Sequence, residues 1–137
     1  VIVGVSGSVF RTIQLSQNVE RVHFAGYVDD KTLAGLYARA TLFVLPSQDE
    51  GFGLPALEAM ASGTPAIVSD GGALPEVVGR AGMTFCLSNQ SELANVMKEC
   101  LRDPGLQAEL REKGLERANM FSWQKTADLV WKNLHEL

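Results

Sequence analysis

The sequence predicts an α/β protein with a doubly wound, Rossmann-like parallel sheet and helices on both of its faces. Two observations lead to this fold class. Short apolar runs alternate along the chain with segments whose apolar residues recur at helical spacing, which is the pattern of repeated strand–helix units. The chain has 137 residues and 46% of them are hydrophobic, so one domain with a sizeable core fits its length.

Five apolar runs are predicted as strands. The clearest is 41–45, because it is β-branched and apolar and because Pro46 stops it. A helical pattern separates most consecutive runs, so the strands are expected to run parallel. In chain order the predicted strands are residues 1–5, 21–24, 41–45, 66–69 and 83–87.

Six helices are predicted between and after these strands. Their expected N-terminal residues, which cap free N–H groups or fit the first turn, are Asp29 or Asp30, Pro55, a position before Glu76, Ser91, Pro104 and Ser122. Gly63 is expected to end the second helix in a left-handed conformation. In the last helix, Trp123 and Trp131 are expected to pack from one face. The charged stretch 109–117 is interpreted as a solvated helix face.

Composition argues against several classes of function. The net charge of −4 disfavours a nucleic-acid-binding surface, which is normally basic. No apolar run approaches the roughly 20 residues that a membrane span needs, and no signal peptide is visible. Cys86 and Cys100 lack the spacing of a metal-ligand pair and are interpreted as reduced thiols, which fits a cytoplasmic protein. Because the chain begins with Val1 rather than methionine, we expect it to be a fragment or a processed form.

The segment 46–54 is the first candidate site, because doubly wound proteins bind ligands at the carboxyl ends of their strands. Gly51 and Gly53 let the backbone approach a ligand closely. The segment leads into a helix N-terminus, where free N–H groups and the helix dipole attract phosphate. Glu50 and Glu58 bracket this N-terminus, and carboxylates accept hydrogen bonds from sugar or ribose hydroxyls. Together these groups are what a nucleotide-sugar requires.

A second interpretation of this spacing stays open. A pair of glycines before a helix also occurs without any ligand. A glutamate early in a helix often only complements the helix dipole. Longer motifs along the chain indicate the function more specifically than this spacing does.

Several ordered motifs resemble the signature of retaining GT-B glycosyltransferases, the large family that includes sucrose and glycogen synthases and bacterial mannosyltransferases. The motifs are residues 50–55, 57–61, 63–65 with Ser69, and 74–78. Glu50 and Glu58 are spaced like the E-x7-E pair of that family. The segment 24–30 is similar to its base-side loop and the segment 121–123 to its closing-helix motif. The resemblance therefore covers essentially the whole chain.

The resemblance implies a role for each matching residue. Glu50 is the implied catalytic residue, since it would hold hydroxyls of the donor sugar near the reacting carbon. Glu58 would accept hydrogen bonds from the ribose. The residues implied to line the sugar and diphosphate are Gly51, Phe52, Gly53 and Leu54, and those implied to border the base through backbone atoms are Gly26, Tyr27 and Val28. The roles of Ser69 and Glu76 stay open.

The resemblance also implies how the enzyme is organised. Residues 1–137 would form a single nucleotide-sugar-binding domain, the C-terminal half of a GT-B fold, without that domain's first strand and helix. The lacking strand would lie between the first and third strands of this chain, so a break in the sheet is expected there. The family's diphosphate-binding Arg and Lys lie upstream of this segment, and its acceptor site lies in an N-terminal domain. The chain alone is therefore expected to be inactive.

The implied function is that of a hexosyltransferase, which transfers a sugar with retention from a UDP-, GDP- or ADP-sugar to an acceptor. The expected partners are the nucleotide-sugar and the missing N-terminal acceptor domain. No cofactor, metal or nucleic acid is expected. Membrane contact is not evident in this chain, and a peripheral membrane location of the full-length enzyme is left open.

Two alternatives were weighed. A nucleotide-sugar epimerase could share the architecture, but the run 50–55 disfavours it. A non-catalytic binding domain that kept the fold is disfavoured by the intact Glu50 and Glu58, since sequence drift is expected to reach such residues first.

Overall fold

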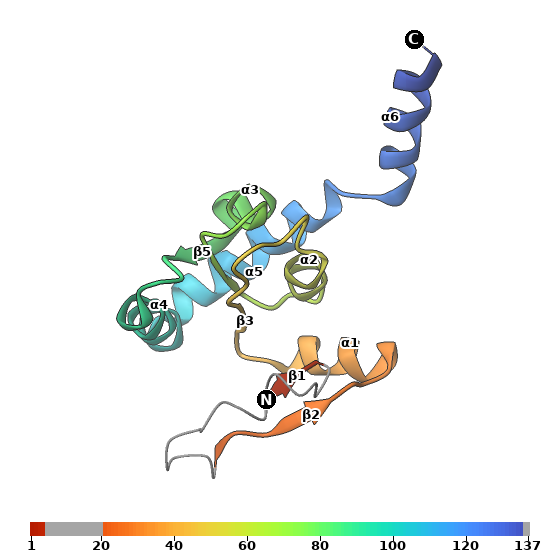
Figure 1. Cartoon of the computed structure of the whole chain (residues 1–137). Coiled ribbons are helices and arrows are strands. Elements are labelled where there is room, and N and C mark those ends of the chain that lie inside the picture. The colour runs from red at the N-terminus through yellow and green to blue at the C-terminus, as the bar shows by residue number, and fades with distance from the viewer. Residues whose placement is uncertain (5–20, 136–137) are drawn as a thin grey trace. The chain divides into compact units, whose positions relative to one another are not determined.

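The structure, a computed structural model, describes residues 1–4 and 21–135 of the chain (Figure 1). It divides into two compact units, Val1–Gly35 and Leu36–Leu137, which are described separately. The α/β fold class is confirmed, because each unit contains parallel strands and helices. The assignment of 1–137 to one domain stays a prediction.

The N-terminal unit contains a two-stranded parallel ladder of β1 (Ile2–Val3) and β2 (Phe24–Gly26). The second strand lies later in the chain than the predicted 21–24. The reason is that its pairing with β1 extends to Gly26, whose carbonyl accepts a hydrogen bond from the N–H of Gly4 at 3.0 Å. The end of the predicted strand 1–5 lies outside the described residues.

Helix α1 (Asp30–Arg39) follows β2 and continues into the second unit. Asp29 caps it, since its Oδ1 accepts a hydrogen bond from the N–H of Thr32 at 2.7 Å. Of the two aspartates predicted as the cap, Asp29 is therefore the one that caps the helix.

The C-terminal unit contains a three-stranded parallel sheet in the order β3-β4-β5. The strands are β3 (Phe43–Leu45), β4 (Ala66–Ser69) and β5 (Gly82–Phe85). The helices after α1 are α2 (Leu54–Ala61), α3 (Leu74–Val78), α4 (Gln90–Arg102), α5 (Pro104–Asn119) and α6 (Trp123–His135), with a 3-10 turn η3 (Gly79–Ala81) after α3. Each of the five predicted strands thus has a counterpart. β4 has the predicted bounds, and the described parts of the other four are shortened or shifted by one to three residues.

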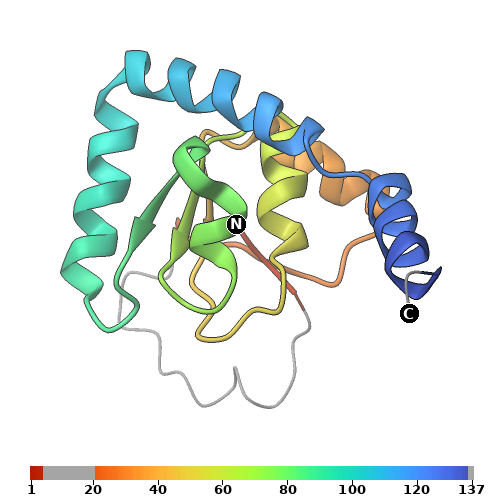
Figure 2. The same cartoon turned by 90° about the horizontal axis from the view of Figure 1, so that it is seen from above.

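Strand β4 forms the centre of the core, and all four of its residues are fully buried. Its alternate side chains face opposite ways, as the pleat of a strand requires. Ala66 and Val68 pack with residues of α2 and α3, whereas Ile67 packs with residues of α4, α5 and β5. Figure 2 shows helices on both sides of these strands. The prediction of a doubly wound arrangement is therefore confirmed for this unit.

The strands form two separate ladders. One ladder pairs β1 with β2 in the N-terminal unit, and the other pairs β3, β4 and β5 in the C-terminal unit. The break expected between the first and third strands stays a prediction.

Helix ends follow local chemistry at most predicted positions. Gly63 has a φ of +74°, which confirms the left-handed end of α2, and the hydroxyl of Ser122 accepts from the N–H of Lys125 at 3.1 Å. Ser91, however, lies inside α4. The cap of that helix is Asn89, whose Oδ1 accepts from the N–H of Glu92 at 3.1 Å.

The expectation that Trp123 and Trp131 pack is wrong for the described residues. No residue of α6 is buried, and these side chains are 78% and 66% exposed. The eight-residue spacing does produce an amphipathic helix, but the described residues supply no surface that covers its apolar face.

Candidate functional site

The loop after β3 holds Glu50 by its side chain and by its backbone. The hydroxyl of Ser47 donates to Oε2 of Glu50 at 3.3 Å, and the Glu50 carbonyl accepts from the N–H of Ala73 at 3.0 Å. Ser47 is itself fixed, because its carbonyl accepts from the hydroxyl of Ser69 at 2.5 Å. Glu50 is half-buried at the carboxyl end of β3. The carboxylate is therefore presented at the sheet edge where the sequence predicts a ligand.

A turn of two glycines packs against this loop. A methyl group at Gly72 would lie 2.5 Å from the carbonyl oxygen of Glu50, and one at Gly71 would collide with the carbonyls of Ser47 and Gln48. Gly72 also has a φ of +55°, which disfavours other residues. The turn thus sets the backbone position of Glu50 by direct contact.

The two glycines beside Phe52 have different surroundings. Gly53 is buried, has a φ of +92°, and a methyl group there would lie 2.6 Å from Cδ2 of Leu74. Gly51 is exposed and has no atom within 4 Å of such a methyl group. Gly53 therefore serves the packing of the loop, whereas Gly51 leaves open space beside the backbone.

Helix α2 begins directly after this loop. Its N-cap residue is Gly53, which has no side chain to accept a hydrogen bond, and Pro55 lies in its first turn. The positive end of the helix dipole therefore lies at Gly53 and Leu54 without a carboxylate cap. Leu54 is exposed, so this end of the helix is accessible.

Glu58 lies on the exposed side of α2, while its neighbours Leu57 and Ala59 are buried. Oε2 of Glu58 accepts a hydrogen bond from the hydroxyl of Tyr37 at 3.1 Å. An ionised carboxylate has about four acceptor positions, so Glu58 keeps capacity for further donors. Burial of the ring, helped by the charge of Glu58, raises the pKa of Tyr37 to about 12. Tyr37 is therefore protonated, and a hydrogen-bond donor, near neutral pH.

Phe52 is held by aromatic contacts that reach the end of α5. Its ring meets the ring of Phe121 edge to face, with 5.7 Å between centroids. The guanidinium of Arg117 lies 4.8 Å from the centre of the Phe121 ring. Arg117 also donates to the carbonyl oxygens of Glu76 at 2.8 Å and Val77 at 3.0 Å. The glycine-rich loop, α3 and the end of α5 are therefore tied together at one point.

Three predicted base-side residues belong to the N-terminal unit. Gly26 ends β2 with a φ of +64°, Tyr27 is 83% exposed, and Val28 is half-buried. They lie at the carboxyl end of their strand, where the sequence places them. The C-terminal unit brings the other predicted residues together on the β3–α2 connection and α2, namely Glu50, Gly51, Phe52, Gly53, Leu54 and Glu58.

Two residues that contribute to this region were not identified from the sequence. In the sequence, Tyr37 recurs with Leu33, Leu36 and Ala40 at helical spacing, which predicts an apolar helix face. Arg117 lies in the charged stretch that was interpreted as a solvated helix face. The need of a buried tyrosine for a hydrogen-bond partner could have indicated that Tyr37 contacts a polar residue. The partners themselves lie 21 and about 40 residues away along the chain, and the sequence spacing did not indicate them.

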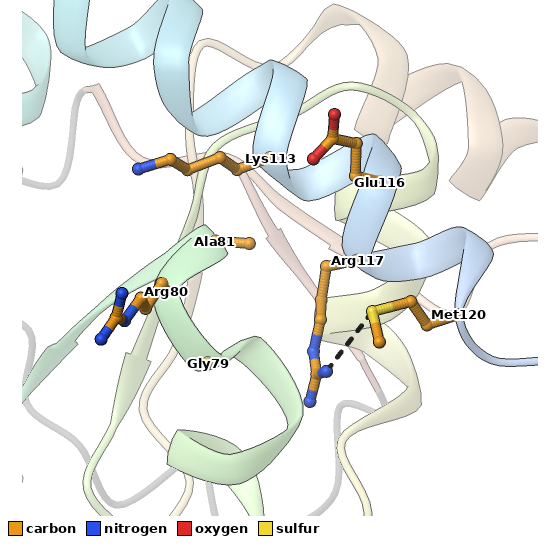
Figure 3. A pocket seen from close by; sticks show the side chains of 7 residues that line it. All are labelled: Gly79, Arg80, Ala81, Lys113, Glu116, Arg117 and Met120. Atoms are coloured by element: carbon orange, nitrogen blue, oxygen red, sulfur yellow. Dashed lines mark hydrogen bonds between the residues drawn. The ribbon is translucent and has the colours of Figure 1, made fainter.

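A pocket of about 360 Å³ lies beside η3 and α5, lined by Arg80, Lys113, Arg117 and their neighbours (Figure 3). None of the predicted site residues lines it. In Figure 3, the Arg117 side chain points down from α5, with its guanidinium 3.7 Å from the sulfur of Met120. The pocket is therefore separate from the candidate site, although it shares Arg117 with the contacts that hold Phe52.

Two structural features are absent from the described residues. Over residues 1–4 and 21–135, no three His, Cys, Asp or Glu side chains gather in a way that could hold a metal ion. In the same part of the chain, no helix is both long enough and apolar enough to span a membrane.

Comparison with known proteins gives matches of three kinds. Residues 1–117 match the family described as glycosyl transferases group 1. The chain is 41% identical over 103 residues to the O-antigen chain mannosyltransferase B of Escherichia coli, which covers 75% of this chain and 27% of that protein. The chain thus spans about a quarter of the length of that curated relative.

Two solved structures resemble this one. Anabaena HepE in complex with UDP and glucose matches with a TM-score of 0.85 and 25% identity, over 98% of this chain and 40% of that one. The C-terminal domain of a glycosyl transferase group 1 family protein from Francisella tularensis, LpcC, matches with a TM-score of 0.64 and 29% identity, over 71% of this chain and 51% of that one. By sequence and by fold, the chain belongs to the group 1 glycosyl transferase family.

Proposed function

We propose that this chain is the donor-binding part of an enzyme that transfers a sugar, with retention, from a nucleoside-diphosphate sugar to an acceptor. One observation carries the proposal. Glu50 and Glu58 lie on either side of a glycine-rich loop that runs into the uncapped N-terminus of α2. Two carboxylates that can accept hydrogen bonds from hydroxyls therefore flank, in sequence, a helix N-terminus that attracts phosphate.

Glu50 is the proposed catalytic residue. Ser47 and the Gly71–Gly72 turn hold it in position, so its carboxylate is preorganised to accept hydrogen bonds from hydroxyls of the donor sugar. Fixing a reacting sugar in this way lowers the entropy that must be lost at the transition state. The role assigned to Glu50 is therefore to position the sugar carbon that reacts.

The diphosphate of the donor is proposed to lie along Gly51, Phe52, Gly53 and Leu54. Negative charge develops on this leaving group as the glycosidic bond breaks, and the dipole of α2 stabilises it. The match covers only 27% of the curated relative O-antigen chain mannosyltransferase B. We therefore assign cationic groups that complete the diphosphate site, and the acceptor site, to a further domain of the full-length protein.

The nucleoside is proposed to be recognised through its ribose and through its base. Glu58 accepts from ribose hydroxyls, while Gly26, Tyr27 and Val28 border the base. HepE, whose structure contains UDP and glucose, supports a nucleoside-diphosphate hexose as the donor class. The proposed reaction uses no cofactor and no metal ion.

Titration calorimetry of the full-length protein with UDP, GDP and ADP tests the site. We expect at least one of them to bind, and Glu58→Ala to weaken that binding by about 1.5–3 kcal/mol through loss of a hydrogen bond to a charged acceptor. Glu112→Ala is the matched control, because Glu112 is an exposed glutamate on α5 and belongs to none of the predicted site motifs. Unchanged affinity in Glu58→Ala would reject the ribose assignment.

A further inference from the structure

We infer that Tyr37 is a positioning residue, which holds the carboxylate of Glu58 so that the site selects nucleotides with ribose hydroxyls. The inference rests on the proposed contact between Glu58 and the ribose. It adds a residue of α1, outside the matched motifs, to the nucleotide site.

The position of the Tyr37 hydroxyl is set by the packing around it. The side chain is 8% exposed, and its ring meets the ring of Phe43 in β3 edge to face at 5.5 Å between centroids. The backbone carbonyl of Tyr37 accepts from the buried hydroxyl of Thr64, in the turn after α2, at 2.5 Å. The tyrosine is therefore fixed against both the sheet and the end of the helix that carries Glu58.

Glu58 has the opposite surroundings. It is exposed on α2, and a glutamate side chain in water samples many rotamers. The hydrogen bond of 3.1 Å from Tyr37 restricts Oε2 to one place. Binding then begins from an oriented carboxylate, so less side-chain freedom is lost when a ligand arrives.

The hydrogen bond from Tyr37 leaves part of the Glu58 carboxylate available to a ligand. An ionised carboxylate only accepts hydrogen bonds, and the Tyr37 hydroxyl occupies one acceptor position on Oε2. The remaining lone pairs of the carboxylate can pair only with donors. A ligand that brings hydroxyl groups to this point, as a ribose does and a dideoxyribose does not, is therefore favoured.

The test uses the full-length protein, with UDP, GDP and ADP and the 2′,3′-dideoxy form of each as probes. For the base that binds tightest, we expect Tyr37→Phe to weaken the ribonucleotide about three- to tenfold, the usual effect of one hydrogen bond. The affinity for the dideoxy form should stay unchanged. Ser62→Ala should change neither affinity, because the Ser62 hydroxyl donates at 2.8 Å to the backbone carbonyl of Glu58 rather than to its carboxylate.

A double-mutant cycle completes the test. If Tyr37 acts through Glu58, Tyr37→Phe should have no further effect on ribonucleotide affinity in a Glu58→Ala background. An equal loss for ribo and dideoxy forms in Tyr37→Phe would indicate a merely structural tyrosine and overturn the inference. The inference would also be overturned if Glu58→Ala loses ribose selectivity while Tyr37→Phe keeps it. In that case the proposed function stands, because the ribose contact of Glu58 does not depend on Tyr37. If Glu58→Ala keeps full ribose selectivity, the ribose contact and the inference fail together.

Discussion

Helices α2 and α6 are both predicted from the sequence to be helices with apolar residues, and they have opposite surroundings. In α2, Ala56, Ala59 and Met60 are fully buried, and the exposed positions include Leu54 and Glu58 at the candidate site. In α6, no residue is buried, although its apolar residues share a face. The difference teaches that an apolar stripe predicts a helix but not whether that helix is covered. It also shows that the candidate site is built on a helix with a fully buried face.

The largest expected difference between the two helices is in stability. Met60→Ala removes a fully buried side chain of α2 and should lower the free energy of unfolding of this chain by about 2–5 kcal/mol. Leu134→Ala, on the exposed side of α6, should change it by less than about 0.5 kcal/mol. Urea unfolding followed by far-ultraviolet circular dichroism measures both. Similar losses in the two variants would break the comparison.

The next effect concerns the turn that supports Glu50. Gly72→Ala introduces both left-handed strain and a collision with the Glu50 backbone, whereas Gly63→Ala, also at positive φ, meets no atom within 4 Å. Gly63→Ala should cost about 1–2 kcal/mol from strain alone. Gly72→Ala should cost more than this and should also slow donor turnover. Equal stabilities in thermal unfolding would mean that the turn does not set the position of Glu50.

The smallest effect is on the titration of Tyr37. Its pKa is raised from an ordinary 10.0 to about 12, so the protonated tyrosine stabilises the folded chain fully below pH 10.0. That stabilisation should be lost as the pH rises through about 12. The tyrosinate absorbance of wild type minus Tyr37→Phe should therefore have its midpoint near 12. A midpoint near 10.0 would contradict the buried hydrogen bond to Glu58.

Local chemistry explains why much of the fold could be predicted. The cap at Asp29, the left-handed Gly63 and the proline in the first turn of α2 depend on neighbours within a few residues. The alternation of β4 between two core clusters follows from its unbroken apolar run. The same reasoning placed the cap of α4 two residues too late, because Asn89 and Ser91 are both good capping residues.

Long-range contacts explain the rest. Gly51 and Gly53 are predicted from the sequence to let the backbone approach a ligand, and the structure adds that a methyl group at Gly53 would collide with Leu74. Gly72, which no motif singled out, is required by the backbone of Glu50. The hydroxyl of Tyr37 and the guanidinium of Arg117 find partners on other helices, and spacing along the chain does not encode those partners. Motif resemblance indicated candidate site residues, and the structure was needed to show what holds them in place.

The central claim is that Glu50 acts on the donor sugar, and the Glu50→Ala variant of the full-length protein tests it most directly. The measurement is release of nucleoside diphosphate from UDP-, GDP- and ADP-hexoses, together with the affinity for the free nucleoside diphosphate. The account predicts that turnover falls by about a hundredfold, because the sugar is no longer positioned, while nucleotide affinity stays at the wild-type value. Full turnover in Glu50→Ala would contradict it.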